Sequence, residues 1–353
     1  MPRLLLLLSL LICAVTTHAA DEKKLLIIGN SYTFYNDLPE LLQAMADADG
    51  TPLTVDSYTA GAMSLRGFLD SPRHAEGRRK LESGDYDYLL LQDQSQTPAY
   101  KPDETLDSVK RWCDLARLHK TKPILFLTWA HAVRAEGKVK LLTAMQDDTS
   151  LTYCKAAVAN KARVAPAGEA WRRWYAKHPG DPLHLPDMSH PTDEGSYLAA
   201  CVIYSTITGK KATGIPVRLK GAPVRIAPAR ARELQKIAAA TLKAFTPAGY
   251  LKKHEESNNK LLSATEARDL LTRDITATEL TEALGKPTLV QKNGKQITYQ
   301  YRLRDNVEFV AYCNSRGKVL NVSISDPAAG VSIIDLSELK TTDRNKKSPN
   351  LQK

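Results

Sequence analysis

The chain has 353 residues, a hydrophobic content of 43% and a charged content of 25%. These values are typical of a soluble globular protein with room for one large and one smaller domain, and they exclude disorder as the default. The 49 lysines and arginines outnumber the 39 acidic residues, but they are scattered and lack interleaved aromatic residues, so we expect no nucleic-acid partner.

The first 19 residues have the pattern of a signal peptide. Arg3 precedes an apolar run from Leu4 to Val15, and Thr17-His18-Ala19 supplies a small-residue cleavage site. The run is too short for a comfortable membrane span, although an uncleaved anchor is the alternative. We therefore expect an exported protein, periplasmic or extracellular, with no stable span after cleavage.

Short apolar segments then alternate with amphipathic ones up to about residue 245. Strands that alternate with helices build a parallel sheet covered on both faces. Residues 21–245 are predicted to form one three-layer α/β domain with a five-stranded parallel sheet. The expected strands are 25–28, 53–58, 86–91, 123–129 and 162–166, and the longest expected helix spans about 138–160.

The composition changes after residue 245. Residues 246–260 contain Pro247, Gly249 and the polar run KKHEESNNK, which are typical of a linker. Residues 261–339 predict two short helices followed by four alternating strands, and hence a small α+β domain with an antiparallel sheet. The polar tail, residues 340–353, is predicted to be disordered.

The stretch LLIIGNSYTFYNDLP, residues 25–39, places a serine at a strand-to-helix turn. A buried strand ends at Gly29, and apolar positions recur from Leu38 on as they do in a helix. A serine on such a turn exposes its hydroxyl beside free backbone N–H groups, which suits a nucleophile and its oxyanion. The alternative is that Asn30 and Ser31 merely cap the helix, since both residue types favour that position.

Glycine and glutamine follow the second and third expected strands. Because the carboxyl ends of parallel strands line one crevice, Gly61, Gln92 and Gln94 are expected near Ser31. A glycine lets its N–H approach a ligand closely, and a glutamine amide can donate a further hydrogen bond. The sequence therefore predicts an oxyanion hole made of Ser31 N–H, Gly61 N–H and one of the two glutamine amides.

The sequence DMSH places Asp187 three residues before His190 in a loop. This spacing lets the carboxylate accept a hydrogen bond from the ring Nδ1 and leaves Nε2 facing the serine. Alone, the pattern more often belongs to an ordinary surface loop. Other histidines, such as His131 and His184, lack the spacing of metal ligands, so we expect neither a metal nor a cofactor.

Several motifs thus occur in order: GNS at 29–31, Gly61, LLQDQSQ, FLTWA and, from His190, HPTDEGSYLAAC. Over about residues 24–245 they resemble the SGNH hydrolases, also called the GDSL esterase and lipase family, in the branch with GNSYT in place of GDS. The resemblance implies a flavodoxin-like sheet and a serine esterase without cofactor. It implies that Ser31 is the nucleophile, His190 the general base and then acid, and Asp187 the carboxylate that orients it.

The third block departs from the pattern of most of this family. An asparagine in GxND is usual there, whereas LLLQDQSQ offers only glutamines. Because a related acetylesterase branch has glutamine at the strand end, Gln92 is favoured as the third oxyanion donor and Gln94 is the alternative.

Signal peptide and resemblance together imply an exported serine esterase that removes acyl groups, acetyl above all, from a carbohydrate or another polar small-molecule ester. We expect Asn30, Tyr32 and Trp129 to line the substrate cleft, although Trp129 and Trp171 fit a buried core equally well. One alternative is a non-catalytic protein on this scaffold that binds a glycan or an envelope partner. The other is a lipase or thioesterase, which needs an apolar acyl channel.

The C-terminal region resembles the small helix-and-sheet modules of envelope lipoproteins of the SmpA/BamE kind. The resemblance rests on ITATELTEALGKPT and on NSRGKVLNV. Because no catalytic constellation occurs there, we expect an interaction or stabilising module that could contact an envelope protein partner.

Overall fold

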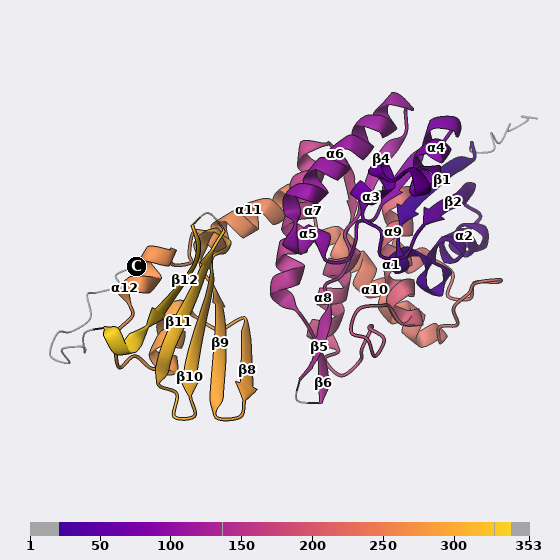
Figure 1. The fold of residues 1–353 in the computed structure, drawn as a ribbon. Coiled ribbons are helices and arrows are strands. Elements are labelled where there is room, and N and C mark those ends of the chain that lie inside the picture. Colours follow the sequence, from indigo (N-terminus) through magenta and orange to yellow (C-terminus); the bar gives the residue numbers. More distant parts are fainter. Residues whose placement is uncertain (1–20, 136, 328, 340–353) are drawn as a thin grey trace, which may run out of the picture.

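The computed structural model describes residues 21–135, 137–327 and 329–339. The predicted signal peptide, residues 1–19, and the predicted tail, residues 340–353, lie outside this part of the chain. Within it, no helix combines the length and apolar character needed to cross a membrane. A larger α/β body and a smaller C-terminal body are joined by the helix α11 (Pro247–Asn258) (Figure 1).

A five-stranded parallel sheet forms the centre of the larger body, as the sequence predicts. Its strands are β1 (Lys23–Gly29), β2 (Leu53–Thr59), β3 (Tyr88–Leu91), β4 (Lys122–Phe126) and β7 (Arg163–Ala165), in the order β2-β1-β3-β4-β7. The register pairs Gly29 with Thr59 and Ile28 with Leu91. The carboxyl ends of β1, β2 and β3 therefore meet at one edge, where ligands bind in open α/β sheets.

Helices cover both faces of this sheet. They are α2 (Leu38–Asp49), α3 (Leu65–Asp70), α4 (Glu76–Ser83), α6 (Pro102–Leu118), α7 (Thr143–Ala159), α8 (Ala167–Lys177), α9 (Asp193–Thr208) and α10 (Pro228–Ala244). Leu25 and Ile27 pack with residues of α2, α8, α9 and α10. Leu26 and Ile28 pack on the opposite face with residues of α3, α4 and α6. Burial on both faces explains why β1 is continuously apolar.

The expected helix over about 138–160 is wrong at its beginning. A hairpin of β5 (Ala132–Ala135) and β6 (Lys138–Leu141) comes first, and α7 begins only at Thr143. In β6 the buried Val139 and Leu141 alternate with exposed lysines, as they should in a strand. The alternation covers only four residues, so it is hard to distinguish in the sequence from the start of the long helix that follows. The hairpin extends from the edge of the larger body (Figure 1).

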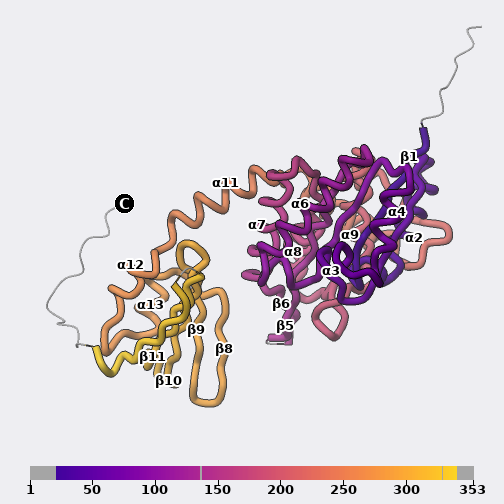
Figure 2. Tube along the Cα trace, turned by 45° about the horizontal axis from the view of Figure 1, so that its top comes forward, coloured from indigo at the N-terminus to yellow at the C-terminus, as the bar shows by residue number. Residues whose placement is uncertain are grey.

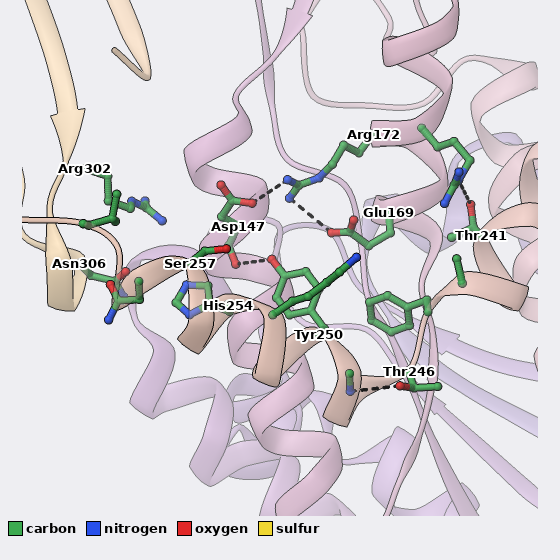
Figure 3. Close-up of a pocket in the computed structure, with 17 residues that line it drawn as sticks. Asp147, Glu169, Arg172, Thr241, Thr246, Tyr250, His254, Ser257, Arg302 and Asn306 are labelled. Atoms are coloured by element: carbon green, nitrogen blue, oxygen red, sulfur yellow. Dashed lines mark hydrogen bonds and ion pairs between the residues drawn. The ribbon is translucent and has the colours of Figure 1, made fainter. Parts of the chain in front are cut away.

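Most of the predicted linker, residues 246–260, is the helix α11. Proline and glycine fit here because they lie in the first turn, where Thr246 caps the helix and its hydroxyl accepts from Gly249 N at 3.1 Å. Tyr250 donates a hydrogen bond to Asp147 O of α7 at 3.3 Å (Figure 3). The linker is therefore a packed helical connection.

The two bodies are also joined by an ion pair. Arg302 donates to both carboxylate oxygens of Asp148, at 2.9 and 2.8 Å. A cavity of about 590 Å³ lies at this joint, between α7, α8 and α11 (Figure 3).

The C-terminal body has two helices, α12 (Ala264–Asp269) and α13 (Ala277–Leu284), and one antiparallel sheet. The sheet is a meander of five strands (Figure 2). Four of them match the predicted ones, and the fifth, β12, had no counterpart in the sequence-based assignment. The strands are β8 (Leu289–Asn293), β9 (Gln296–Arg302), β10 (Glu308–Asn314), β11 (Val319–Asp326) and β12 (Gly330–Asp335).

Candidate active site

Ser31 is the first residue of a short helix, α1 (Ser31–Phe34), which begins directly after β1 and Asn30. Asn30 is the N-cap, and its side-chain oxygen accepts from Tyr32 N at 3.3 Å. The cap is thus the residue before the serine, so the hydroxyl of Ser31 is left for other contacts. Capping and a nucleophilic role therefore do not exclude each other here.

His190 connects Ser31 with Asp187. Its Nε2 lies 3.0 Å from Ser31 Oγ, and its Nδ1 lies 2.7 Å from Asp187 Oδ2. With the proton on Nδ1 donated to the carboxylate, Nε2 is free to accept the serine proton. The structure brings together the three residues that the sequence predicts as a triad.

Asp187 also organises the loop that carries His190. Its Oδ1 accepts from the backbone N–H of Ser189 at 3.0 Å and of His190 at 2.9 Å. Partial burial acts to raise the pKa of Asp187, but the hydrogen bonds from the His190 ring and these two amides outweigh it and lower the pKa to about 2. The group facing the imidazole is therefore a carboxylate at neutral pH.

Two residues directly after α1, which the sequence analysis does not predict, contact His190 and its neighbour Pro191. The ring of Tyr35 stacks on the His190 ring, with centroids 4.1 Å apart and an interplanar angle of 12°. Asn36 donates to Pro191 O at 3.0 Å. Both residues lie within five positions of Ser31, but nothing in their spacing shows that the loop at 187–191 folds back onto them.

The three residues expected to line the substrate cleft are buried instead. Asn30 is 2% exposed, Tyr32 1% and Trp129 0%. Tyr32 stacks on Trp129 at 4.5 Å, and Trp129 stacks on Trp171 at 4.0 Å. This aromatic stack lies beneath the triad, because Trp129 Nε1 donates to Ser189 O at 3.0 Å. Asn30, Tyr32 and Trp129 therefore do not line the open cleft that was expected, but pack beneath the triad and support it.

Gly61 lies beside the serine turn. The β1–β2 pairing continues past the strand ends, since Ala60 N donates to Gly29 O at 3.2 Å. Gly61 is the next residue and is exposed. Within the described part of the chain, neither Gly61 N–H nor Ser31 N–H donates to another protein group. These two N–H groups are therefore available to an oxyanion.

Gln92 does not have the role predicted for it. Its Oε1 accepts from Asn30 N at 2.8 Å and from Thr33 Oγ1 at 2.9 Å. Its Nε2 donates to Asn30 Oδ1 at 2.9 Å and to Asp93 O. Because both amide hydrogens are engaged below the turn, Gln92 supports Asn30 and has none left for an oxyanion. The same side chain explains Gly29, where an added Cβ would lie 2.7 Å from Gln92 Oε1.

Gln94 is oriented differently. Its Oε1 accepts from the N–H groups of Gln96 at 2.7 Å and Thr97 at 3.1 Å. Because the amide oxygen is bound to the backbone of residues 96 and 97, the amide nitrogen points away from that segment. Among the described residues this nitrogen has no acceptor. Gln94 is therefore the better placed of the two glutamines for a ligand.

Asp93, between the glutamines, is a buried acid that the sequence analysis did not single out. Its Oδ1 accepts from Leu65 N at 2.9 Å, and its Oδ2 accepts from Thr105 Oγ1 at 2.6 Å. Burial raises the pKa of Asp93. The carboxyl group ties the loop after β3 to α3 and α6, and so fixes the position of Gln94.

His184 anchors the beginning of the base loop and is 3% exposed. Its Nδ1 lies 2.7 Å from Tyr175 Oη and its Nε2 lies 3.0 Å from Ala130 O. The carbonyl can only accept, so Nε2 carries the proton and the tyrosine donates to Nδ1. Burial, the largest influence, lowers the pKa of His184 from 6.5 to about 4.

Acid is therefore expected to destabilise the fold through His184. The His184 ring takes up a second proton near pH 6.5 in the unfolded chain but only near pH 4 in the folded chain. The free energy of unfolding is therefore unaffected by His184 above pH 6.5 and decreases as the pH falls from 6.5 towards 4. The loss approaches about 3 kcal/mol. Urea unfolding at pH 7 and pH 4.5 measures it. His184→Gln should be less stable at pH 7 but less sensitive to acid; an unchanged pH dependence in this variant would contradict the assignment.

A second cavity, of about 1210 Å³, lies between the β5–β6 hairpin and the β8–β9 side of the C-terminal body. In the part of the chain that is described, neither this cavity nor the one at α11 is lined by the triad. No group of three or more His, Cys, Asp or Glu residues in that part has a metal-binding arrangement.

The chain matches no protein-family profile and no curated protein sequence. Its fold is similar to that of a DUF4886 family protein from Bacteroides uniformis ATCC 8492, with 21% identity over 63% of this chain and 95% of that one and a TM-score of 0.52. Also similar are an SGNH hydrolase candidate from Slackia heliotrinireducens (24% identity, 53% and 100% covered, TM-score 0.46) and the acetyl xylan esterase AlAXEase (12% identity, 52% and 99% covered, TM-score 0.44). At 21% identity the likeness to the Bacteroides protein concerns the fold alone.

Proposed function

We propose that the protein is a serine esterase that hydrolyses acyl esters, acetyl esters above all, of a carbohydrate or another polar alcohol. One observation carries the proposal: Asp187, His190 and Ser31 form an unbroken hydrogen-bonded relay, at 2.7 and 3.0 Å, at the edge of the sheet where Gly61 N–H is unengaged. A carboxylate, an imidazole and a hydroxyl in this order generate a nucleophile at neutral pH.

The acylation step follows from this geometry. Ser31 Oγ attacks the ester carbonyl carbon while His190 Nε2 takes the hydroxyl proton. The carbonyl oxygen becomes an oxyanion that accepts from Ser31 N–H and Gly61 N–H. As the C–O bond breaks, the His190 imidazolium returns the proton to the leaving alcohol, and the acyl group remains on Ser31. Asp187 stabilises the imidazolium through Nδ1.

Deacylation uses the same groups with water as nucleophile. His190 Nε2 removes a proton from water, hydroxide adds to the acyl carbon, and the proton then passes to Ser31 Oγ as the acid leaves. The cycle consumes one water and restores the free serine, so it needs no metal and no cofactor.

The surroundings of the triad favour a polar alcohol. Ser189 in the base loop is a partly exposed polar residue, and so are Ser95 and His131 beside it. A panel of p-nitrophenyl esters from acetate to decanoate, together with acetylated mono- and oligosaccharides, tests this. We expect acetate and the acetylated sugars to be hydrolysed fastest. A rate that rises with chain length would indicate a lipase or thioesterase instead.

The two glutamines after β3 are expected to differ in their effect on catalysis. Gln94→Leu should lower kcat about 10²-fold if its amide completes the oxyanion hole, with little change in melting temperature. Gln92→Leu should chiefly destabilise the protein, because it leaves Asn30 N without its acceptor. Steady-state kinetics and thermal melts of both variants measure this; equal kinetic effects at normal stability would contradict the assignment.

The alternative function is that of a glycan- or envelope-binding protein on the same scaffold. One observation favours it: the Gln92 amide is bound to Asn30 and cannot donate to an oxyanion. If Gln94 does not donate either, only the two backbone N–H groups of Ser31 and Gly61 remain, and catalysis would be slow. Such a protein would bind acetylated glycans without turning them over.

Export and an envelope partner for the C-terminal body belong to the same proposal. They are supported by the signal-peptide pattern of residues 1–19 and by the separate fold of residues 261–339. Fractionation of cells that express the full chain tests export: the protein should lack its first 19 residues and be found outside the cytoplasm, and full-length protein in the cytoplasm would contradict it.

A further inference from the structure

Four polar side chains beside the triad form a connected cluster that the proposed chemistry does not use. Tyr32 Oη lies 2.9 Å from Ser189 Oγ, which lies 3.2 Å from His131 Nε2. The same ring nitrogen lies 3.3 Å from Ser95 Oγ. We call Tyr32, Ser95, His131 and Ser189 the His131 cluster.

The cluster joins segments that carry the proposed active site. His131 comes from the loop after β4, between the aromatic stack and the β5–β6 hairpin. Each of the other three members is the direct chain neighbour of a predicted site residue, so the cluster restrains the segments that carry those residues. The adjacent pairs are Ser31 with Tyr32, Gln94 with Ser95, and Ser189 with His190.

Ser189 is the member closest to the base and is held at three points. Its N–H donates to Asp187 at 3.0 Å, its carbonyl accepts from Trp129 Nε1 at 3.0 Å, and its hydroxyl belongs to the cluster. The first two contacts restrain its backbone from the sides of Asp187 and Trp129. The third, between its hydroxyl and both Tyr32 and His131, restrains the same residue from the side of the loop after β4.

His131 is itself held firmly. Its carbonyl accepts from Leu142 N at 2.9 Å, and its N–H lies 3.4 Å from Met145 Sδ. Burial, and then the nearby His190, lower the pKa of its ring. A neutral ring suits this place, because a second cation next to His190 would oppose the imidazolium that acylation requires.

We propose that His131 is a positioning residue, which holds Ser189 and thereby keeps the His190 imidazole within hydrogen-bond distance of Ser31. The inference rests on the proposed esterase function. It assigns to the loop after β4 a role that the triad motifs do not contain.

Three substitutions of His131 separate the effect of its ring volume from that of its hydrogen bond to Ser189. His131→Ala removes ring and nitrogen, His131→Phe keeps the ring volume without polar atoms, and His131→Gln places an amide nitrogen near the position of Nε2. We expect the Ala and Phe variants to lose about 10- to 100-fold in kcat for p-nitrophenyl acetate, since small misplacements of a catalytic group are costly. KM should change much less, and the Gln variant should recover most of the rate. His119→Ala, at the far end of α6, is the matched control.

Crystal structures of the wild type and His131→Ala test the inference without activity. We expect the distance from His190 Nε2 to Ser31 Oγ to be 3.0 Å in the wild type and too long for a hydrogen bond in the variant. An unchanged distance with wild-type turnover would overturn the inference. If the wild type hydrolyses no ester, the proposed function fails, and the distance still decides whether His131 positions the base.

Discussion

Replacing Ser31 by alanine is expected to lower kcat for p-nitrophenyl acetate by at least about 10⁴-fold, because it removes the hydroxyl that would form the acyl intermediate. Ser31 Oγ is the atom that His190 Nε2 contacts at 3.0 Å. Among the described residues this is the only hydrogen bond of the Ser31 hydroxyl, so the melting temperature should change little. Initial rates of the purified variant and of the wild type, with both melts recorded, give the comparison.

Ser83→Ala is the matched control for Ser31→Ala. Within the part of the chain that the structure describes, its hydroxyl bonds only to Arg79 O of its own helix, at 2.8 Å, and Ser83 is exposed. This variant should hydrolyse the ester at the wild-type rate. Turnover by Ser31→Ala within about tenfold of the wild type would show that Ser31 is not the nucleophile.

Asp187→Asn is expected to reduce kcat by about 10³- to 10⁴-fold while the loop keeps its shape. The amide oxygen can still accept from the backbone N–H groups of Ser189 and His190, as Asp187 Oδ1 does at 3.0 and 2.9 Å. The amide nitrogen, however, would donate to His190 Nδ1. The ring would then carry its proton on Nε2, where it cannot accept the proton of Ser31.

Thermal melts separate this tautomer effect from unfolding. Asp187→Asn should melt close to the wild type, and Asp107→Asn, an exposed position on α6, should match the wild type in rate and stability. If Asp187→Asn kept more than about a tenth of the wild-type kcat, the carboxylate would not be the group that orients the base.

The parts of the fold with strong periodicity were predictable. The continuous apolar run at 25–28 predicts a strand buried on both faces, and the structure places it inside the sheet, between β2 and β3. The serine turn was predictable for the same reason, since a strand, a glycine and a helix pattern follow one another directly. Asp187 and His190 are close in sequence, so their contact is a local property of the loop.

Other features depend on contacts that sequence spacing does not reveal. Gln92 was assigned to the oxyanion hole, but the hydrogen-bonding groups of Asn30, 62 residues away, engage its amide. Trp129 was assigned to the cleft, but Tyr32 and Trp171 enclose it. In both cases the neighbours in space decide the role of the residue.

The missed strands have a similar explanation. In the edge strand β12, Val331 and Ile333 are exposed and Ile334 on the other face is only partly buried, so apolar residues on both faces hide the alternation that marks a strand. In the β5–β6 hairpin, only four residues per strand carry the alternation. Short segments of this kind become strands because a neighbour supplies hydrogen bonds, and the neighbour is not known beforehand.

Time-resolved labelling of the full chain with a fluorophosphonate, followed by peptide mapping, tests the central claim most directly. A serine activated by His190 should react rapidly and stoichiometrically, with the adduct confined to Ser31 and abolished in His190→Ala. Slow labelling spread over several serines, or none at Ser31 in a correctly folded protein, would contradict the account and leave the scaffold as a binding protein.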